Sequence, residues 1–214
     1  MGTINKYSKS DYMELPSTKT QLDFIERGKQ VVKSYTKDGF KLLSISEGRL
    51  YRILQMMNKA RLVQECDTPE HLEKLSLIYS SRQDVWPLSQ LYIAENDYFY
   101  KVLKHLTSFA EDWIERPLKP EIVFGPRRYN RSSRLLNHVD RARTHIISIT
   151  MTLDYEVEEE WPLVLEIENE IVEVILKPGE YLFYEGARIP HSRPHPLNGK
   201  FYTNMYFHWS VLEG

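Results

Sequence analysis

The sequence predicts an α+β fold in which a mainly helical N-terminal half supports a β-barrel or jelly roll in the C-terminal half. One observation is a change of pattern near Pro120: apolar residues recur at helical spacing before it, and short runs rich in Ile, Val, Tyr and Thr follow it. A second is that these runs number about eight and are separated by turn residues, which is typical of a barrel or jelly roll. A third is the apolar content of 42% in 214 residues, which is enough for one core.

The chain divides into an N-terminal arm and one domain. Residues 1–18 are polar and contain a proline, so we expect a flexible arm. Residues 19–214 then form a single domain, with a mainly helical support over residues 19–120 and the jelly-roll core over residues 121–214.

Turn residues divide the helical half into separate elements. The expected elements are a helix from Thr20 to the turn at Lys37, a strand over residues 39–45, a helix over residues 46–63, a helix start at Thr68, a loop over residues 80–87 and a long helix over residues 89–116. Pro117 ends the long helix, because proline cannot continue a helix without losing a hydrogen bond. Its aromatic stripe is expected to pack on a sheet.

The C-terminal half contains only strand-like runs and turns. The runs are EIVFG, RRY, SRLLNHVD, RTHIISITMTLD, WPLVLEI, NEIVEVIL, EYLFYEG, ARIPHSRP and KFYTNMYFHWSVL. Their β-branched and aromatic residues favour strands, and the preceding helices are expected to buttress one of the resulting sheets.

Composition and charge exclude several classes of protein. A net charge of −2 and a pI near 6.4 provide no basic field for a nucleic-acid backbone. Cys66 is the only cysteine, so no intrachain disulfide can form and a reducing compartment is expected. The first residues lack the apolar core of a signal peptide, and no run approaches the roughly 18 apolar residues that a membrane span needs. We therefore expect a cytoplasmic protein that binds neither membrane nor nucleic acid; the sequence does not indicate an oligomeric state.

His138 and Asp140 form the first part of a candidate metal site. Residues two apart in a strand project from the same face, so an imidazole and a carboxylate would point into one space. His191 follows a later strand-like run, and two histidines with one carboxylate are the ligands of non-haem Fe(II) oxygenases. His195 is the competing second histidine, but it lies between prolines in a loop.

The ordered set of motifs around these residues resembles the 2-oxoglutarate and Fe(II)-dependent dioxygenase superfamily, and within it the prolyl 4-hydroxylase-like group. The set is GPRRYNRSSRLLNHVDR, THIISITMTLD, WPLVLEI, LKPGEYLFYEGARIPHSRP and PLNGKFYTNMYFHW, and it covers roughly the C-terminal 40% of the chain. The resemblance implies a double-stranded β-helix, an eight-strand jelly roll with the metal inside its open mouth.

The resemblance also implies residue roles. His138, Asp140 and His191 would be the catalytic metal ligands, and Lys200, nine residues after His191, would bind the far carboxylate of 2-oxoglutarate with help from Tyr129. Because Lys200 follows a glycine and could lie in a turn, two other residues stay open as the anion partner. They are Arg193 and Tyr202.

The implied activity is hydroxylation of a C–H bond with release of succinate and CO2, using Fe(II), 2-oxoglutarate and O2, with ascorbate as a further reductant. The substrate would be prolyl, peptidyl or a small amino-acid-like molecule. The acidic run over residues 154–160 is either a rim that attracts a cationic substrate or a solvated loop. Two alternatives stay open: a jelly roll that only binds or regulates, and a cupin-like metalloenzyme that does not use 2-oxoglutarate.

Overall fold

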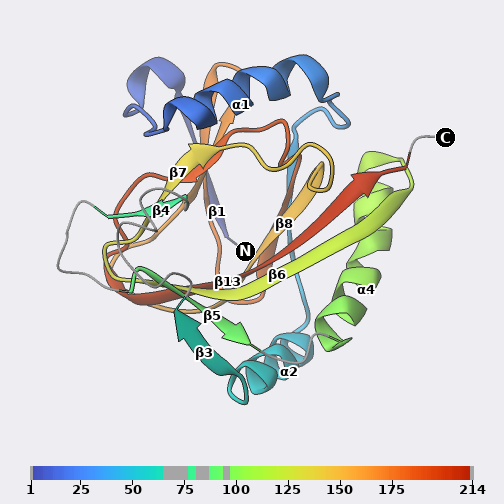
Figure 1. Ribbon diagram of the computed structural model, residues 1–214, viewed down its shortest axis with the longest axis vertical. Helices are drawn as coiled ribbons and strands as arrows, with labels where there is room; N and C mark the ends of the chain where they lie inside the picture. The colour runs from blue at the N-terminus through green and yellow to red at the C-terminus, as the bar shows by residue number, and fades with distance from the viewer. Residues whose placement is uncertain (1, 65–76, 81–86, 94–96, 213–214) are drawn as a thin grey trace.

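Two antiparallel sheets face each other and form the centre of the molecule, with helices on the outside (Figure 1). The computed structural model describes residues 2–64, 77–80, 87–93 and 97–212. The expected helix start at Thr68 and most of the expected loop over residues 80–87 lie outside these residues. None of the described helices has the length and apolar content needed to cross a bilayer.

The smaller sheet has six strands in the order β1-β10-β9-β12-β7-β4. These strands are β1 (Thr3–Ser8), β10 (Glu170–Ile175), β9 (Leu163–Ile167), β12 (His191–Arg193), β7 (Arg134–His138) and β4 (Ile78–Tyr79). All its pairings are antiparallel, and the short strand β12 lies between β9 and β7.

The larger sheet has seven strands in the order β2-β11-β8-β13-β6-β5-β3. These strands are β2 (Phe40–Ser44), β11 (Glu180–Tyr184), β8 (Ile147–Val157), β13 (Gly199–Val211), β6 (Leu118–Asn130), β5 (Ser89–Ile93) and β3 (Arg61–Gln64). The eight strands β6 to β13 correspond to the predicted C-terminal runs, with EIVFG and RRY joined in β6. The predicted double-stranded β-helix is confirmed.

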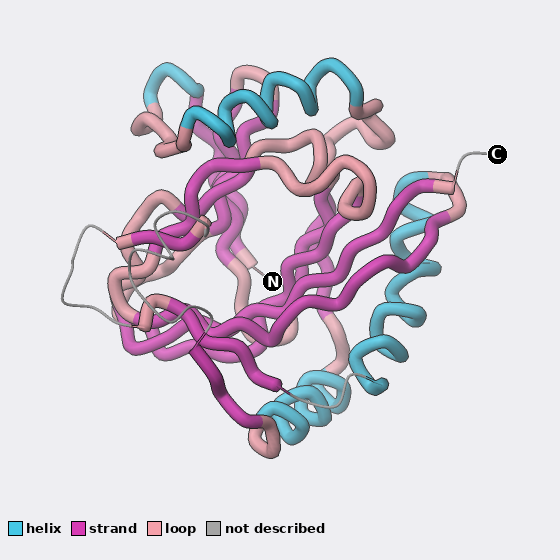
Figure 2. The backbone as a smooth tube through the Cα atoms, in the orientation of Figure 1, coloured by secondary structure: helices cyan, strands magenta, loops and turns pink. Residues whose placement is uncertain are grey.

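Two helices cover the outer face of the larger sheet: α2 (Glu47–Met57) and α4 (Asp97–Ile114) (Figures 1 and 2). Buried side chains of α4, such as Phe99 and Leu106, join one apolar cluster with Phe183, Phe207 and Trp209 of the sheet. The helix is amphipathic, so its stability comes from this burial. The same clustering fixes the orientation of β8, β11 and β13, whose other face points into the molecule.

Helix α1 (Lys19–Val31) lies at the other end of the molecule, beside β7 (Figure 1). Thr18 caps it through a capping box, in which the Thr18 hydroxyl accepts from the Gln21 amide and the Gln21 side chain accepts from the Thr18 amide. Two bonds tie the preceding segment to β7: Ser17 Oγ donates to the Asn137 carbonyl, and the Asn137 amide donates to the Pro16 carbonyl. The helix is therefore held next to the end of β7.

Three expectations for the N-terminal half were wrong. Thr3–Ser8 are not a loose arm, because they pair with β10 along their whole length. The long helix does not begin at residue 89: Ser89–Ile93 form strand β5, and helix α4 begins at Asp97. Three short strands among the described residues, β3, β4 and β5, interrupt the expected helical support and extend the two sheets, whereas the strand expected over residues 39–45 is present as β2.

Candidate metal centre

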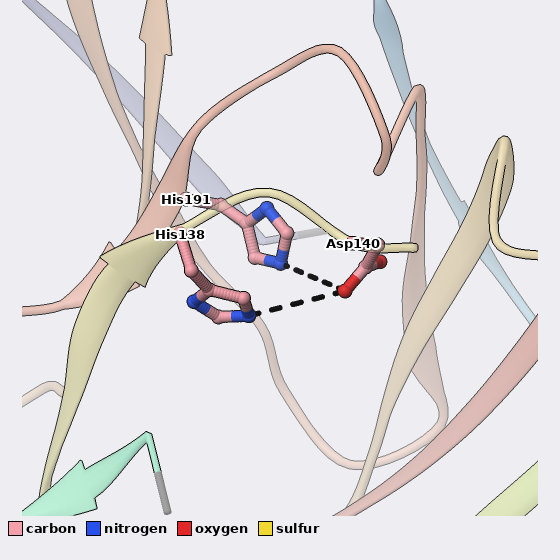
Figure 3. A group of neighbouring side chains, drawn as sticks. All are labelled: His138, Asp140 and His191. Atoms are coloured by element: carbon pink, nitrogen blue, oxygen red, sulfur yellow. Dashed lines mark ion pairs between the residues drawn. The ribbon is translucent and has the colours of Figure 1, made fainter. Parts of the chain in front are cut away.

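His138, Asp140 and His191 come together at the inner end of β7 (Figure 3). His138 is the last residue of β7 and His191 the first of β12, and the antiparallel register places these two residues opposite each other. Their ring centres are 4.3 Å apart. Cross-strand pairing thus joins two histidines that lie 53 positions apart in the sequence.

Both imidazoles point their Nε2 atoms toward the centre of the group and their Nδ1 atoms toward backbone carbonyls. The Nδ1 of His138 lies 2.7 Å from the Leu136 carbonyl, and that of His191 lies 3.0 Å from the Ile189 carbonyl. A carbonyl only accepts, so each Nδ1 carries the proton and each Nε2 carries a free lone pair. Hydrogen bonds from Nδ1 to backbone carbonyls commonly orient histidines that bind a metal through Nε2.

Asp140 supplies the carboxylate from the loop after β7. Its Oδ1 lies 3.9 Å from His138 Nε2 and 3.7 Å from His191 Nε2, as the dashed lines in Figure 3 mark. Its Oδ2 accepts a 2.7 Å bond from Ser148 Oγ, and its amide donates to the Gly186 carbonyl. A Cβ at Gly186 would lie 2.4 Å from Asp140 Oδ2, so only glycine leaves room for the carboxylate here.

Burial and neighbouring charges together shift the pKa values of His138 and Asp140. Burial lowers the pKa of His138 to about 3, and the neighbouring His191 acts in the same direction. Burial alone would raise the pKa of Asp140, but the three nearby histidines and the Ser148 hydrogen bond outweigh it and lower that pKa to about 2. Near neutral pH a neutral His138 imidazole thus faces a carboxylate, which are the protonation states that a divalent cation requires.

The residues fit a metal ion of the Fe(II) type. One ligand atom from each of the three residues lies within 4.8 Å of the others. Two imidazoles and one carboxylate on one side leave the other coordination positions open, which is the facial triad of non-haem Fe(II) oxygenases. The predicted ligand set is therefore brought together by the fold.

An inner cavity of about 480 Å³ adjoins this group, between the two sheets. His138, Asp140 and His191 line it, together with Arg193 from the same strand as His191. Its other walls include aromatic and apolar side chains: Phe124, Tyr129, Leu135, Leu163, Tyr184 and Tyr206. A small co-substrate would fit in this space beside the metal.

Arg193 is 1% exposed and holds its guanidinium inside the molecule. The guanidinium lies 4.5 Å from the Trp161 ring centre and 4.7 Å from that of Tyr202, and Nη1 donates to the Trp161 carbonyl. The Asn204 amide oxygen, oriented toward Arg193, accepts from Nη2 at 3.1 Å. Among the described residues no carboxylate lies within ion-pair distance of this buried cation, which favours an anionic ligand.

The structure separates the other residues predicted to bind the co-substrate. Tyr129 lines the cavity, and its hydroxyl lies 2.6 Å from that of Tyr206. The Tyr202 hydroxyl forms hydrogen bonds with Thr152 and with the Leu176 carbonyl, and the Tyr202 ring contacts the Arg193 guanidinium. Tyr202 therefore does not line the cavity.

The prediction for Lys200 was wrong. Its side chain is 70% exposed and pairs with Glu156 at 2.6 Å. Lys200 lies on β13 within the register shift between Gly199 and Phe201, and it points to solvent. The spacing from His191 had suggested an inward side chain, and the strand register could not be read from the sequence.

The remaining candidates also lie away from the metal group. His195 contacts Tyr12 and Glu173, so it does not compete with His191. The acidic run lies near the far end of β8, where Glu158 pairs with Arg131. Glu156 lies eight residue steps along β8 from Ser148, a distance of about 26 Å, so this run is no rim of the metal site.

Two site residues were missed from the sequence. Arg127 and Tyr206 line the cavity, and Arg127 lies 4.6 Å from the Phe124 ring centre. Tyr206 alternates with Met205 and Phe207, which are buried in the apolar cluster on the other face. This period-two pattern along KFYTNMYFHW was a usable signal for an inward tyrosine.

No protein-family model and no curated protein sequence matches the chain. Solved structures match its whole fold. HygX from Streptomyces hygroscopicus, with nickel, 2-oxoglutarate and hygromycin B bound, is 12% identical with a TM-score of 0.56, over 91% of this chain and 87% of that one. A 2OG-Fe(II) oxygenase family oxidoreductase from Burkholderia pseudomallei is 16% identical with a TM-score of 0.55, over 93% and 95%. The chain has the fold of the 2-oxoglutarate and Fe(II)-dependent oxygenases.

Prolyl hydroxylases are among the proteins that share this oxygenase fold. A prolyl hydroxylase from Trichoplax adhaerens, in complex with a peptide fragment of the hypoxia inducible factor oxygen degradation domain, is 13% identical with a TM-score of 0.52, over 90% of this chain and 94% of that one. The oxygenase fold and the His-Asp-His group are thus found together in this chain, as the sequence motifs predicted. At such low identity the likeness concerns the fold and carries no substrate.

Proposed function

We propose that the protein is a 2-oxoglutarate and Fe(II)-dependent oxygenase that hydroxylates a C–H bond of its substrate. The observation that carries this proposal is the group of His138, Asp140 and His191 on the wall of a cavity that Arg193 also lines. Arg193 is buried and has no carboxylate partner among the described residues. The first three residues would hold Fe(II), and Arg193 would hold the far carboxylate of 2-oxoglutarate. When bound, these groups supply an O2-dependent oxidation in which decarboxylation of 2-oxoglutarate to succinate and CO2 is coupled to hydroxylation of the substrate.

Arg193 suits this role for electrostatic reasons. A buried cation is costly unless it is paired, and a carboxylate offers the bidentate partner that a guanidinium fits. The rings of Trp161 and Tyr202 both contact the guanidinium, so it needs little ordering when the ligand arrives. Tyr129 adds a phenol to the same cavity wall, in agreement with the role implied for it by the resemblance.

The hydrogen bonds around the ligands set the orientation of the site. The Leu136 and Ile189 carbonyls hold the two imidazoles with Nε2 inward, and Ser148 holds the outer oxygen of Asp140. The apolar side chains Phe124, Leu135 and Leu163 form part of the cavity wall and lower the local dielectric constant, which strengthens the charge interactions inside it.

The test is succinate formation by the protein reconstituted anaerobically with Fe(II) and then given O2 and 2-oxoglutarate. Prolyl peptides and free amino acids are the first substrates to add, because prolyl hydroxylases share the fold. We expect substrate-dependent succinate release that His138→Ala and Asp140→Ala abolish. Metal binding without any 2-oxoglutarate turnover would contradict the proposal and favour the cupin-like alternative.

The residue assigned to the co-substrate has its own test. Arg193→Gln should raise the KM for 2-oxoglutarate at least tenfold, because it removes a charge-assisted pair of about 1.5–3 kcal/mol. Lys200→Gln is the matched control and should leave that KM unchanged, because the lysine faces solvent. The reverse result would reject Arg193 as the anion partner.

A further inference from the structure

A second, larger cleft lies between helix α1 and the loop that joins β7 to β8. Its volume is about 1,220 Å³, and its floor includes His138 and Asp140, which also line the inner cavity. The metal group therefore lies where the two spaces meet. A molecule in the cleft would reach the metal group from this second space, which shares Val139 and Arg141 with the inner cavity.

The cleft is a built feature, because both of its walls are anchored. Helix α1 approaches the site closely at Gly28, where a Cβ would lie 3.0 Å from the Ala187 carbonyl and 3.7 Å from Val139 Cγ2. The segment before the helix is hydrogen-bonded to β7 through Ser17 and Asn137. The helix thus packs directly on the loop that carries Asp140.

Basic side chains dominate the cleft. Arg27 comes from α1, and Arg141 and Arg143 come from the loop after the metal ligands. All three are exposed, and among the described residues no carboxylate lies within ion-pair distance of any of them. The fourth basic residue, Lys119, is paired with Glu121 at 3.0 Å.

The acidic side chains of the cleft do not neutralise these arginines. Glu121 is engaged by Lys119 and by a 2.7 Å bond from Ser210 Oγ. Asp140 belongs to the metal group. Within the described part of the chain, the three guanidinium groups around this opening have no carboxylate partner and produce a local positive field, although the chain as a whole carries a net charge of −2.

The cleft also offers an aromatic surface. Phe24 of α1 lines it and is 54% exposed, which is unusual for a phenylalanine on a helix that packs on the domain. Leu77 and Val139 add apolar surface nearer the metal. A ligand for this cleft would combine an anionic group with an apolar or aromatic part.

We propose that the cleft binds a small organic substrate through a carboxylate or phosphate group, held by Arg27, Arg141 and Arg143, with its apolar part against Phe24. The proposal rests on the proposed function and names the substrate class of that site. A small molecule is favoured over a nucleic acid, because the basic groups are confined to one cleft and the chain has a pI near 6.4.

The test is ligand binding to the metal-free protein, which does not depend on turnover. Phenyl phosphate and benzoate are compared with benzyl alcohol and benzamide by saturation-transfer NMR and titration. We expect the two anions to bind at least tenfold more tightly than their neutral partners. Arg27→Gln/Arg143→Gln, which changes two arginines that line the cleft but not the inner cavity, should lower the affinity for phenyl phosphate about tenfold, as expected for loss of charged hydrogen bonds.

Two controls locate the binding. Arg52→Gln removes an exposed arginine from α2, at the other end of the molecule, and should change nothing (Figure 1). The titration is repeated with excess 2-oxoglutarate, which should leave the binding of phenyl phosphate to the cleft unchanged; displacement of phenyl phosphate would place the anion in the inner cavity and overturn the proposal.

Three further outcomes would overturn it. They are equal binding of the neutral probes, unchanged affinity in the double variant, and a single-stranded oligonucleotide that binds more tightly than phenyl phosphate through the same arginines. Because succinate release is measured separately, anion binding by the cleft in a protein without turnover would support this site and reject only the proposed function.

Discussion

The two faces of β8 and β13 are equally buried but differ completely in chemistry. The outer face, against the helices, carries Ile147, Ile149, Met151, Leu153, Met205, Phe207 and Trp209. The inner face, toward the metal group, carries Ser148, Thr150, Thr152, Tyr202, Asn204, Tyr206 and His208. Apart from the half-buried Tyr206, residues of both faces are at most 5% exposed.

The difference shows that burial alone does not separate structure from function in this molecule. Apolar burial on the outer face supplies stability, because it scales with the area removed from water. Polar burial on the inner face costs free energy unless each group is bonded. Here Ser148 bonds Asp140 and His208, and Thr152 bonds Tyr202, so the inner polar groups form a network that supports the site.

The largest expected effect breaks the outer face. Trp209→Ala should lower the free energy of unfolding by about 3–5 kcal/mol, because it empties a fully buried site and removes the bond from Nε1 to Thr107. Urea titration measures this loss. Phe109→Ala, on α4 but 44% exposed, is the control and should cost far less. Equal losses in the two variants would contradict the assignment of the outer face as the core.

A smaller effect tests the inner face. Ser148→Ala removes the hydroxyl that orients Asp140. It should weaken metal binding about 10- to 100-fold, as for other residues that hydrogen-bond to a metal ligand. The unfolding free energy without metal should change by less than in Trp209→Ala. Anaerobic titration with Fe(II) measures the affinity. Unchanged metal affinity would show that Ser148 is only a packing residue.

The smallest effect concerns a residue that belongs to neither face. Lys200→Ala removes an exposed ion pair with Glu156 and should change the unfolding free energy by less than about 1 kcal/mol. It should also leave metal affinity unchanged. A clear loss of metal or 2-oxoglutarate binding would mean that this side chain turns inward in solution.

The C-terminal half could be predicted well from sequence, because its strands are runs rich in β-branched and aromatic residues that turn residues separate. His138, Asp140 and His191 followed from strand spacing together with the motifs around them. The register of the strands could not be predicted in the same way. One shift between Gly199 and Phe201 decides where Lys200 points, and no sequence pattern marks it.

The N-terminal half was predicted less well, because its short strands depend on partners far away in the chain. Thr3–Ser8 are mostly exposed and polar, and they form a strand only because β10 offers an open edge. Ser89–Ile93 were absorbed into the predicted helix, since their few apolar residues fit either period. Arg27 and Arg141 could not be placed in one cleft before the position of α1 was known.

The central claim is that the two histidines and the aspartate form one metal site. Its most direct test is the metal content of the protein after anaerobic reconstitution with Fe(II) and removal of excess metal, for the parent and for His191→Ala. We predict one bound iron per chain in the parent and none in a folded His191→Ala variant. Equal iron in both proteins, or no iron in either, would contradict the account.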